Sequence, residues 1–284
     1  SGNIEVVSID PKKNAIRLKI RKDTNSDFFQ WFHFRLTGAV DQRCKISIIN
    51  AGKSSYPGGW KNYQACASYD REEWFRVPTT FRNGILTIDF EPEHNSVYFA
   101  YFAPYSYERH LDLIHETQLF DNVSMEVVGK TFEGRDIEML RVGKPGKNKK
   151  IIWVIARQHP GESMAEWFIE GMLSRLLDED DPVSRTLLKE AVFYVVPNMN
   201  IDGSIAGNLR SSASGANLNR EWQRPTKKYS PEVFYVRNKR DETGMVIMTM
   251  NHIRLMIPFA EPVAAGYLES QESFGIIIVS VNFF

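Results

Sequence analysis

The hydrophobic pattern of the first hundred residues is typical of short β-strands. Apolar and polar residues alternate over brief runs, and Gly, Pro and Asn turn signals separate the runs. The runs with this pattern cover residues 16–20, 31–36, 45–49, 74–77 and 85–90, and a further strand that begins near Val97 ends at Pro104. Because no helical periodicity interrupts them, they predict an antiparallel β-sandwich of about a hundred residues. We expect its many aromatic residues, Trp31, Trp60 and Trp74 among them, to fill the core.

The second part of the chain alternates strand and helix patterns. In chain order it predicts a hairpin over 124–129 and 136–142, a strand over 151–156, helices over 163–177 and 184–190, a strand over 191–196 and a loop over 197–203. The strand over 151–156 consists of consecutive apolar residues, which indicates burial on both faces. The order predicts an α/β domain, with a mixed sheet flanked by helices. We place the β-sandwich in residues 1–115 and the α/β domain in residues 116–284.

Charge and cysteine content exclude several classes of function. The chain has 35 basic and 35 acidic residues, so no net charge favours nucleic acid or an anionic membrane surface. No segment has the length of a membrane-spanning helix, and the N-terminus lacks a secretory pattern. Two cysteines, Cys44 and Cys66, do not make a disulfide framework. We therefore expect a cytoplasmic protein; its oligomeric state is not predicted.

Candidate chemistry lies directly after the buried strand over 151–156. His159 and Glu162 stand in a Pro-Gly turn before the next helix, at the strand's carboxyl end, where α/β sheets place their ligand sites. Imidazole and carboxylate are zinc ligands, although a catalytic site requires a third. A histidine in such a turn also caps helices, so this motif alone leaves both interpretations open. On the helical stretch that precedes the α/β domain, His110 and His115 are expected to be surface residues.

Three motifs in order resemble those of the zinc metallocarboxypeptidases. They are Gln158-His159-Pro160-Gly161-Glu162, the stretch 196–203 with its Pro-Asn-Met-Asn sequence, and Asn217-Leu218-Asn219-Arg220-Glu221-Trp222. Within that family the chain is similar to the cytosolic carboxypeptidase branch. Residues 98–114 resemble the end of that branch's accessory β-sandwich. The resemblance extends to about Gly244.

The resemblance implies a role for each matching residue. His159 and Glu162 match two zinc ligands, and Arg210 matches the arginine that polarises the scissile carbonyl and stabilises the oxyanion. Asn219 and Arg220 match the pair that binds the terminal carboxylate of the substrate. The residue types suit these roles, because a guanidinium binds carboxylates and stabilises a developing oxyanion.

Beyond Gly244 the family pattern is lost. The third zinc ligand of the family is a histidine, and His252 is the only candidate; it follows an apolar run over 245–250 that predicts a strand. Met250 and Ile253 stand where the family has Asp and Gly. No glutamate matches the family's general base. The apolar tail over 274–284 predicts either a terminal strand or an exposed aggregation-prone segment. Our hypothesis is that the chain is truncated or diverged after this point.

The resemblance implies zinc-dependent removal of C-terminal residues from peptides or proteins, with glutamate as the residue removed. Two alternatives remain open. The first is a carboxylate-binding protein or fragment without catalysis, because no general base is found. The second is an acylase-type zinc hydrolase of N-acyl amino acids, which shares the fold and the carboxylate clamp.

Overall fold

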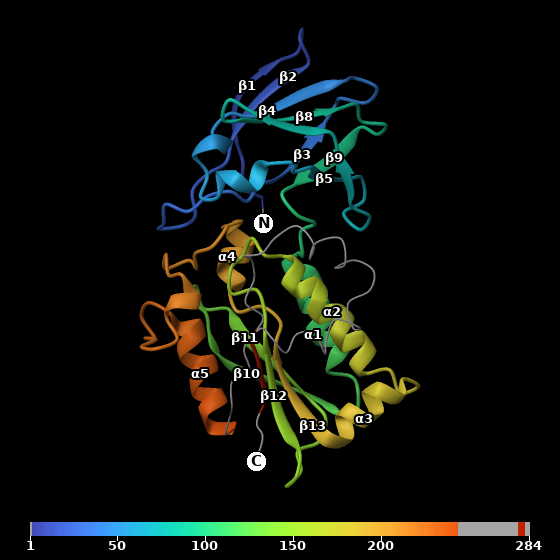
Figure 1. The fold of residues 1–284 in the computed structure, drawn as a ribbon, viewed down its shortest axis with the longest axis vertical. Helices are drawn as coiled ribbons and strands as arrows, with labels where there is room; N and C mark the ends of the chain where they lie inside the picture. The colour runs from blue at the N-terminus through green and yellow to red at the C-terminus, as the bar shows by residue number, and fades with distance from the viewer. Residues whose placement is uncertain (1, 244–277, 282–284) are drawn as a thin grey trace.

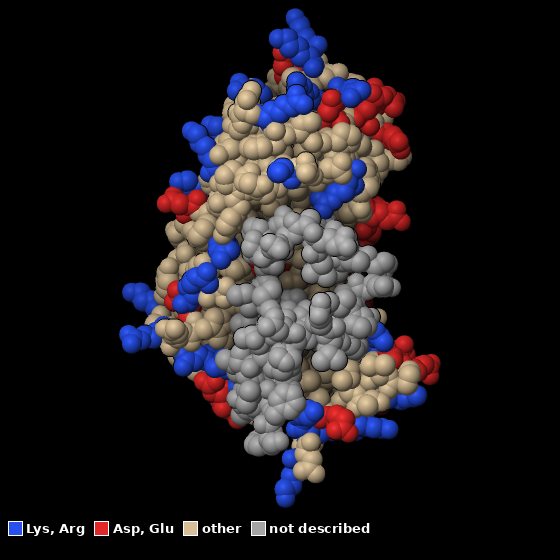
Figure 2. All heavy atoms as spheres, in the orientation of Figure 1, with Lys and Arg blue, Asp and Glu red and all other residues tan. Residues whose placement is uncertain are grey.

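The computed structural model describes residues 2–243 and the strand at residues 278–281. Figure 1 shows a β-rich domain at one end of the long axis and an α/β domain at the other. On the face drawn in Figure 2, both basic and acidic side chains lie on each domain. No helix among the described residues is long and apolar enough to cross a membrane.

The first domain is a sandwich of two sheets, as predicted. Its five-stranded sheet has the order β1-β2-β4-β8-β7 and its four-stranded sheet the order β3-β9-β5-β6. The elements are β1 (Glu5–Asp10), β2 (Ala15–Lys19), β3 (His33–Thr37), β4 (Cys44–Ile48), the 3-10 turns η1 (Ala51–Lys53) and η2 (Pro57–Trp60), β5 (Ala65–Ser68), β6 (Phe75–Val77), β7 (Thr79–Arg82), β8 (Ile85–Phe90) and β9 (Ser96–Ala100). Side chains from both sheets form one core, with Trp31 and Trp60 each 1% exposed.

Three features of this sandwich differ from the sequence prediction. The sheet is not wholly antiparallel, because β2 pairs with β4 in parallel. Strands β1, β5 and β7 were not predicted. Strand β1 lies at the edge of its sheet, and Val6 and Ile9 are 59% and 62% exposed, so it shows no alternation between a buried and a solvated face. Trp74 is only half-buried, unlike the other two tryptophans.

The second domain contains one mixed sheet of order β10-β11-β13-β12-β14. Its elements are α1 (Tyr107–Thr117), β10 (Val123–Lys130), β11 (Asp136–Val142), β12 (Lys150–Ile155), α2 (Met164–Leu176), α3 (Pro182–Glu190), β13 (Ala191–Val196), α4 (Ile201–Ala206), the 3-10 turn η3 (Leu218–Arg220), α5 (Pro231–Thr243) and β14 (Ile278–Val281). Strands β12 and β13 are parallel, whereas β10, β11 and β14 pair with their neighbours antiparallel. This is the predicted α/β arrangement.

Both faces of the central strand β12 are covered, as its apolar run predicts. Val154 packs with α1 and α2 in one core cluster, and Trp153 and Ile155 pack with α5 in another. Figure 1 shows α1, α2 and α3 on one side of the sheet and α5 on the other. Because neither face meets water, β12 fixes the position of the turn that follows it.

Helix α4 corrects one detail of the prediction. Residues 197–203 were expected to form a loop, but the helix begins at Ile201. Asn200 accepts a hydrogen bond from Gly203 N at 3.2 Å and thereby caps this helix. The Pro and Asn residues that suggested a loop are thus the start signal of a helix. For the apolar tail the sequence left two options, and residues 278–281 form a strand that pairs with β12. The strand expected over 245–250 lies outside the described residues.

Candidate functional site

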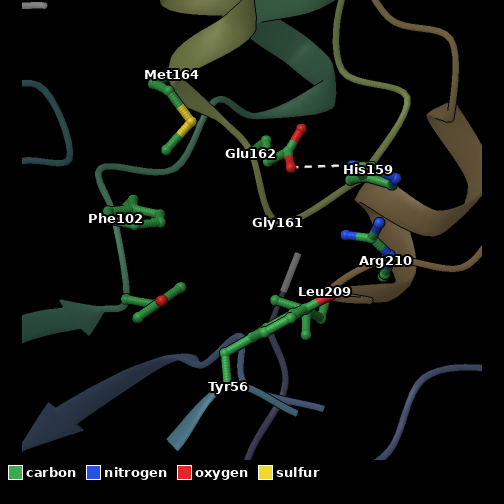
Figure 3. A pocket seen from close by; sticks show the side chains of 9 residues that line it. Tyr56, Phe102, His159, Gly161, Glu162, Met164, Leu209 and Arg210 are labelled. Carbon is green, nitrogen blue, oxygen red and sulfur yellow. Dashed lines mark hydrogen bonds and ion pairs between the residues drawn. The ribbon is translucent and has the colours of Figure 1, made fainter. Parts of the chain in front are cut away.

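His159 and Glu162 lie in the turn between β12 and α2, which we name the 157–162 turn. His159 Nδ1 lies 2.9 Å from Glu162 Oε1 (Figure 3), and the two residues are 4% and 8% exposed. Glu162 N donates to His159 O at 3.1 Å, and Gly161 N donates to Leu209 O at 2.9 Å. A side chain at Gly161 would place its Cβ 2.9 Å from Leu209 O, so only glycine fits here. The turn therefore brings a nitrogen and an oxygen ligand together.

The contact of His159 Nε2 bears on whether Nδ1 can act as a metal ligand. Nε2 lies 3.1 Å from Asn217 Oδ1, which accepts a hydrogen bond from Nε2 in the tautomer that leaves Nδ1 without a proton. The lone pair of Nδ1 then faces a carboxylate oxygen of Glu162, and a cation, either a proton or a metal ion, belongs between them. Metal-binding histidines donate their other N–H to an oxygen in this way. The donor set and its orientation fit zinc.

A third ligand is not found among the described residues. No group of three His, Cys, Asp or Glu side chains that would hold a metal ion occurs between residues 2 and 243. His252, the expected third ligand, lies outside the described residues.

Arg157 holds the start of the turn. Its backbone has φ of +51°, a left-handed conformation that few non-glycine residues adopt. Its guanidinium donates to Pro160 O and to Tyr105 O, each at 2.9 Å, and forms a short hydrogen bond with Glu166. These bonds tie the turn to helix α2 and to the segment that enters the α/β domain. No motif in the sequence had indicated this role for Arg157.

The buried carboxylate of Glu166 also binds His110, which corrects the expectation that this histidine is a surface residue. His110 is 1% exposed, with Nδ1 2.8 Å from Glu166 Oε1 and Nε2 3.6 Å from Glu138 Oε2. Burial lowers the pKa of His110, but the two carboxylates outweigh this effect and raise it to about 9. His115 lies on the same helix and is exposed, as expected.

Arg210 faces the same pocket as the His159–Glu162 pair (Figure 3). It lies between α4 and η3, in a segment that we name the 207–216 loop. Its guanidinium carbon lies 5.7 Å from the ring centre of Phe28 and 5.9 Å from that of Tyr56, both from the β domain. Within the described part of the chain the guanidinium has no carboxylate partner. Its donors are therefore available to a bound carbonyl or carboxylate.

Both domains line this pocket. The residues around it are Tyr56, Tyr101, Phe102, His159, Gly161, Glu162, Met164, Leu209 and Arg210. Three of the nine are aromatic residues of the β domain, and they were not predicted to contribute. Asn219 and Arg220, on η3, are not among the lining residues; they follow Asn217 by two and three positions, and Arg220 is exposed.

Comparison with known proteins decides the family. Residues 1–102 match the cytosolic carboxypeptidase N-terminal domain, and residues 108–249 match the zinc carboxypeptidase family. The chain belongs to the zinc carboxypeptidase family. Members of this family are hydrolases, and the family implies zinc as the metal. The match to the second domain ends five residues after Gly244, where the sequence pattern is lost.

Bacterial relatives match this zinc carboxypeptidase chain over both domains. A Zymomonas mobilis protein of unassigned activity is 52% identical over 244 residues, covering 86% of this chain and 63% of that protein. The crystal structure of a metallo-carboxypeptidase from Burkholderia cenocepacia is 51% identical with a TM-score of 0.83, and covers 86% of this chain and 65% of that one.

Two further comparisons bear on ligands and on the branch of the family. A metallo-carboxypeptidase from Pseudomonas aeruginosa, solved in complex with (2-guanidinoethylmercapto)succinic acid, is 46% identical with a TM-score of 0.83, and the match covers 86% of this chain and 65% of that one. Human cytosolic carboxypeptidase 1 is 27% identical over 282 residues, covering 84% of this chain and 23% of that protein. The chain thus spans less than two thirds of the length of each of these relatives.

Proposed function

We propose that this protein is a zinc-dependent carboxypeptidase that hydrolyses the last peptide bond of peptide or protein substrates. The observation that carries the proposal is the geometry of His159, whose Nε2 is held by Asn217 while Nδ1 faces Glu162. Arg210 lines the same pocket with no carboxylate partner among the described residues. A pair of metal ligands beside a guanidinium with free donors suits acyl transfer, because a metal ion and a cation can both stabilise the developing oxyanion.

Each residue has a defined task in this proposal. His159 and Glu162 would hold zinc, with His252 as the third ligand, and zinc when bound would act as a Lewis acid toward the scissile carbonyl. Asn217 keeps the proton of His159 on Nε2. Arg210 donates hydrogen bonds to the carbonyl oxygen as negative charge develops on it.

The substrate carboxylate would be recognised by Asn219 and Arg220. A guanidinium fork binds a carboxylate through two parallel hydrogen bonds, and this excludes substrates whose C-terminus is blocked. We further propose glutamate as the residue removed and a cytoplasmic location, because the first domain matches that of the cytosolic carboxypeptidases.

Metal analysis of purified, dialysed protein tests the site. We expect about one zinc per chain, and loss of that zinc in His159→Ala and in His252→Ala. His115→Ala serves as the matched control, because His115 is exposed on α1, and it should retain zinc. Absence of zinc from the wild-type protein would contradict the proposal, and retention in His252→Ala would remove His252 from the ligand set.

Hydrolysis then separates the proposal from its two alternatives. The zinc-loaded protein should cleave a peptide that ends in glutamate and should leave its C-terminally amidated form intact. Cleavage of N-acyl amino acids in place of the peptide would favour the acylase. Binding of the free peptide without cleavage would indicate a carboxylate-binding protein.

A further inference from the structure

The β domain contacts the 207–216 loop through a buried carboxylate. Asp23 is 5% exposed, and it accepts three consecutive backbone hydrogen bonds: from Leu209 N at 2.6 Å, from Arg210 N at 2.8 Å and from Ser211 N at 2.8 Å. Successive backbone N–H groups of this kind form a concavity that binds an anion. Here a side chain of the neighbouring domain occupies it.

The two residues after Asp23 extend this contact, so that residues 23–25 lie alongside the 207–216 loop. Thr24 N donates to Asn208 Oδ1 at 3.1 Å, and Asn25 Nδ2 donates to Ala213 O at 2.9 Å. Gly215 has φ of +89°, and a Cβ there would lie 2.4 Å from Asn25 O. The backbones of the loop and of residues 23–25 therefore approach so closely here that Gly215 leaves no room for a side chain.

Arg210 is the residue that this contact fixes. Its backbone N–H is the middle one of the three that Asp23 binds, and its guanidinium lies over Phe28 and Tyr56 of the same domain. Leu209 joins the loop to the metal-binding turn, since Leu209 O accepts from Gly161 N at 2.9 Å. The β domain thus determines both ends of the Arg210 side chain relative to the His159–Glu162 pair.

We propose that Asp23 is a positioning residue for the hydrolytic reaction: it holds the backbone of residues 209–211 so that the Arg210 guanidinium stands where the oxyanion forms. This inference rests on the proposed function for the role of Arg210. Burial of a carboxylate is costly unless hydrogen bonds compensate it. Neutral side chains such as Thr24 and Asn25 already connect the domains, so docking alone does not require that cost.

Kinetics of Asp23→Asn test the proposal. The amide has one acceptor oxygen, and its NH2 group would oppose at least one backbone N–H of the loop. Because a displacement of about 1 Å in a catalytic group lowers rates by up to about 100-fold, we expect kcat to fall about 10- to 100-fold with zinc content unchanged. Asp27→Asn is the matched control: Asp27 lies in the same segment, its side chain is 94% exposed, and kcat should not change.

A double-mutant cycle separates positioning from general stability. If Asp23 acts through Arg210, Asp23→Asn should lower kcat less than about twofold once Arg210→Ala is present. An equal reduction in both backgrounds, or no reduction in the wild-type background, would overturn the proposal. Phe28→Leu supplies the second route when Asp23→Asn does not fold, because it removes a ring beneath the guanidinium and should show the same dependence on Arg210.

Amide hydrogen exchange provides a readout that requires neither zinc nor turnover. Loss of the carboxylate should accelerate exchange of residues 209–211 and leave α2 and β12 protected, whereas Asp27→Asn should change neither. Unchanged protection of residues 209–211 in Asp23→Asn would refute the positioning role. If the wild-type protein is inactive but the exchange protection of residues 209–211 still requires Asp23, the proposed function is refuted, whereas the structural contact between Asp23 and the loop is supported.

Discussion

Glu232, near the start of α5, shows how burial changes the chemistry of one residue. It is 1% exposed, Oε1 accepts from Phe132 N at 3.1 Å, and Oε2 has no partner among the described residues. Burial raises the pKa of Glu232 to about 7, and the charge of Asp202 acts in the same direction. The folded state therefore favours the protonated carboxyl.

Glu232→Gln should accordingly stabilise the protein in alkaline solution. The unfolded carboxyl titrates near 4.5 and the folded one near 7, so its stabilising contribution is complete below pH 4.5 and is lost as the pH rises through 7. Glutamine removes that loss, and we expect a gain of about 2–3 kcal/mol at pH 8 and little change at pH 4.5. Urea unfolding at the two pH values measures this; a variant less stable than wild type at pH 8 would show that the ionised group is well accommodated.

Among the elements, the 157–162 turn is held by contacts from distant parts of the chain and from within itself. Leu209 O accepts the N–H of Gly161, and Arg157 binds the carbonyl of Pro160. The sequence predicted the position of the turn, because an apolar strand, a Pro-Gly pair and a helical period follow one another. It did not predict the close approach of the 207–216 loop, since Leu209 is distant in the chain.

Gly161→Ala should disturb this turn. The new Cβ would lie 2.9 Å from Leu209 O and 3.2 Å from Leu209 Cα, both backbone atoms that yield little. We expect a loss of about 1–3 kcal/mol in the free energy of unfolding and weaker retention of zinc. Thermal unfolding and metal analysis measure the two effects.

Gly58→Ala is the control for this substitution, because no atom lies within 4 Å of a Cβ at that position. Its stability should remain within about 0.5 kcal/mol of wild type. If Gly161→Ala behaves like this control, the 207–216 loop yields more readily than the geometry indicates.

At the scale of the whole molecule, a buried network joins the elements around the sheet. His110 of α1 lies between Glu166 of α2 and Glu138 of β11, and Arg157 binds Glu166 from the end of β12. Asn198 Nδ2 adds a hydrogen bond to Glu166 at 2.9 Å. One charged cluster therefore connects α1, which follows the β domain, to β12 and the 157–162 turn.

This network should make stability fall in mildly alkaline solution. The pKa of His110 is raised from 6.5 to about 9 on folding, so the stabilisation is complete below pH 6.5 and is lost as the pH rises through 9. We expect a decrease of about 3 kcal/mol in the free energy of unfolding across that interval. In His110→Gln only the smaller decrease that Glu232 contributes near pH 7 should remain; an identical pH profile in the variant would show that His110 is neutral in the folded protein.

Local patterns predicted most elements of both domains, because alternation and helical periodicity record which face of an element is buried. They did not predict β1, whose residues do not alternate between buried and exposed. They also gave a loop where α4 begins, because the residues that cap this helix are also common in loops. The resemblance pointed to His159, Glu162 and Arg210, which line one pocket, and their roles stay predictions. Asp23, Phe28 and Tyr56 were not identified, since nothing in a local pattern connects a residue to a loop that follows it by more than 150 positions.

The separation of 186 residues between Asp23 and Leu209 also bears on how the chain is made. Synthesis proceeds from the N-terminus and domains fold as units, so the β domain is complete before the ribosome adds the 207–216 loop. The Asp23 carboxylate is then already in place when the loop emerges. The loop can bind to a surface that has formed, so the long-range contact does not have to form between two unfolded segments. A circular permutant with the β domain last would lose this order, and Arg210 would reach its position only after the β domain had folded.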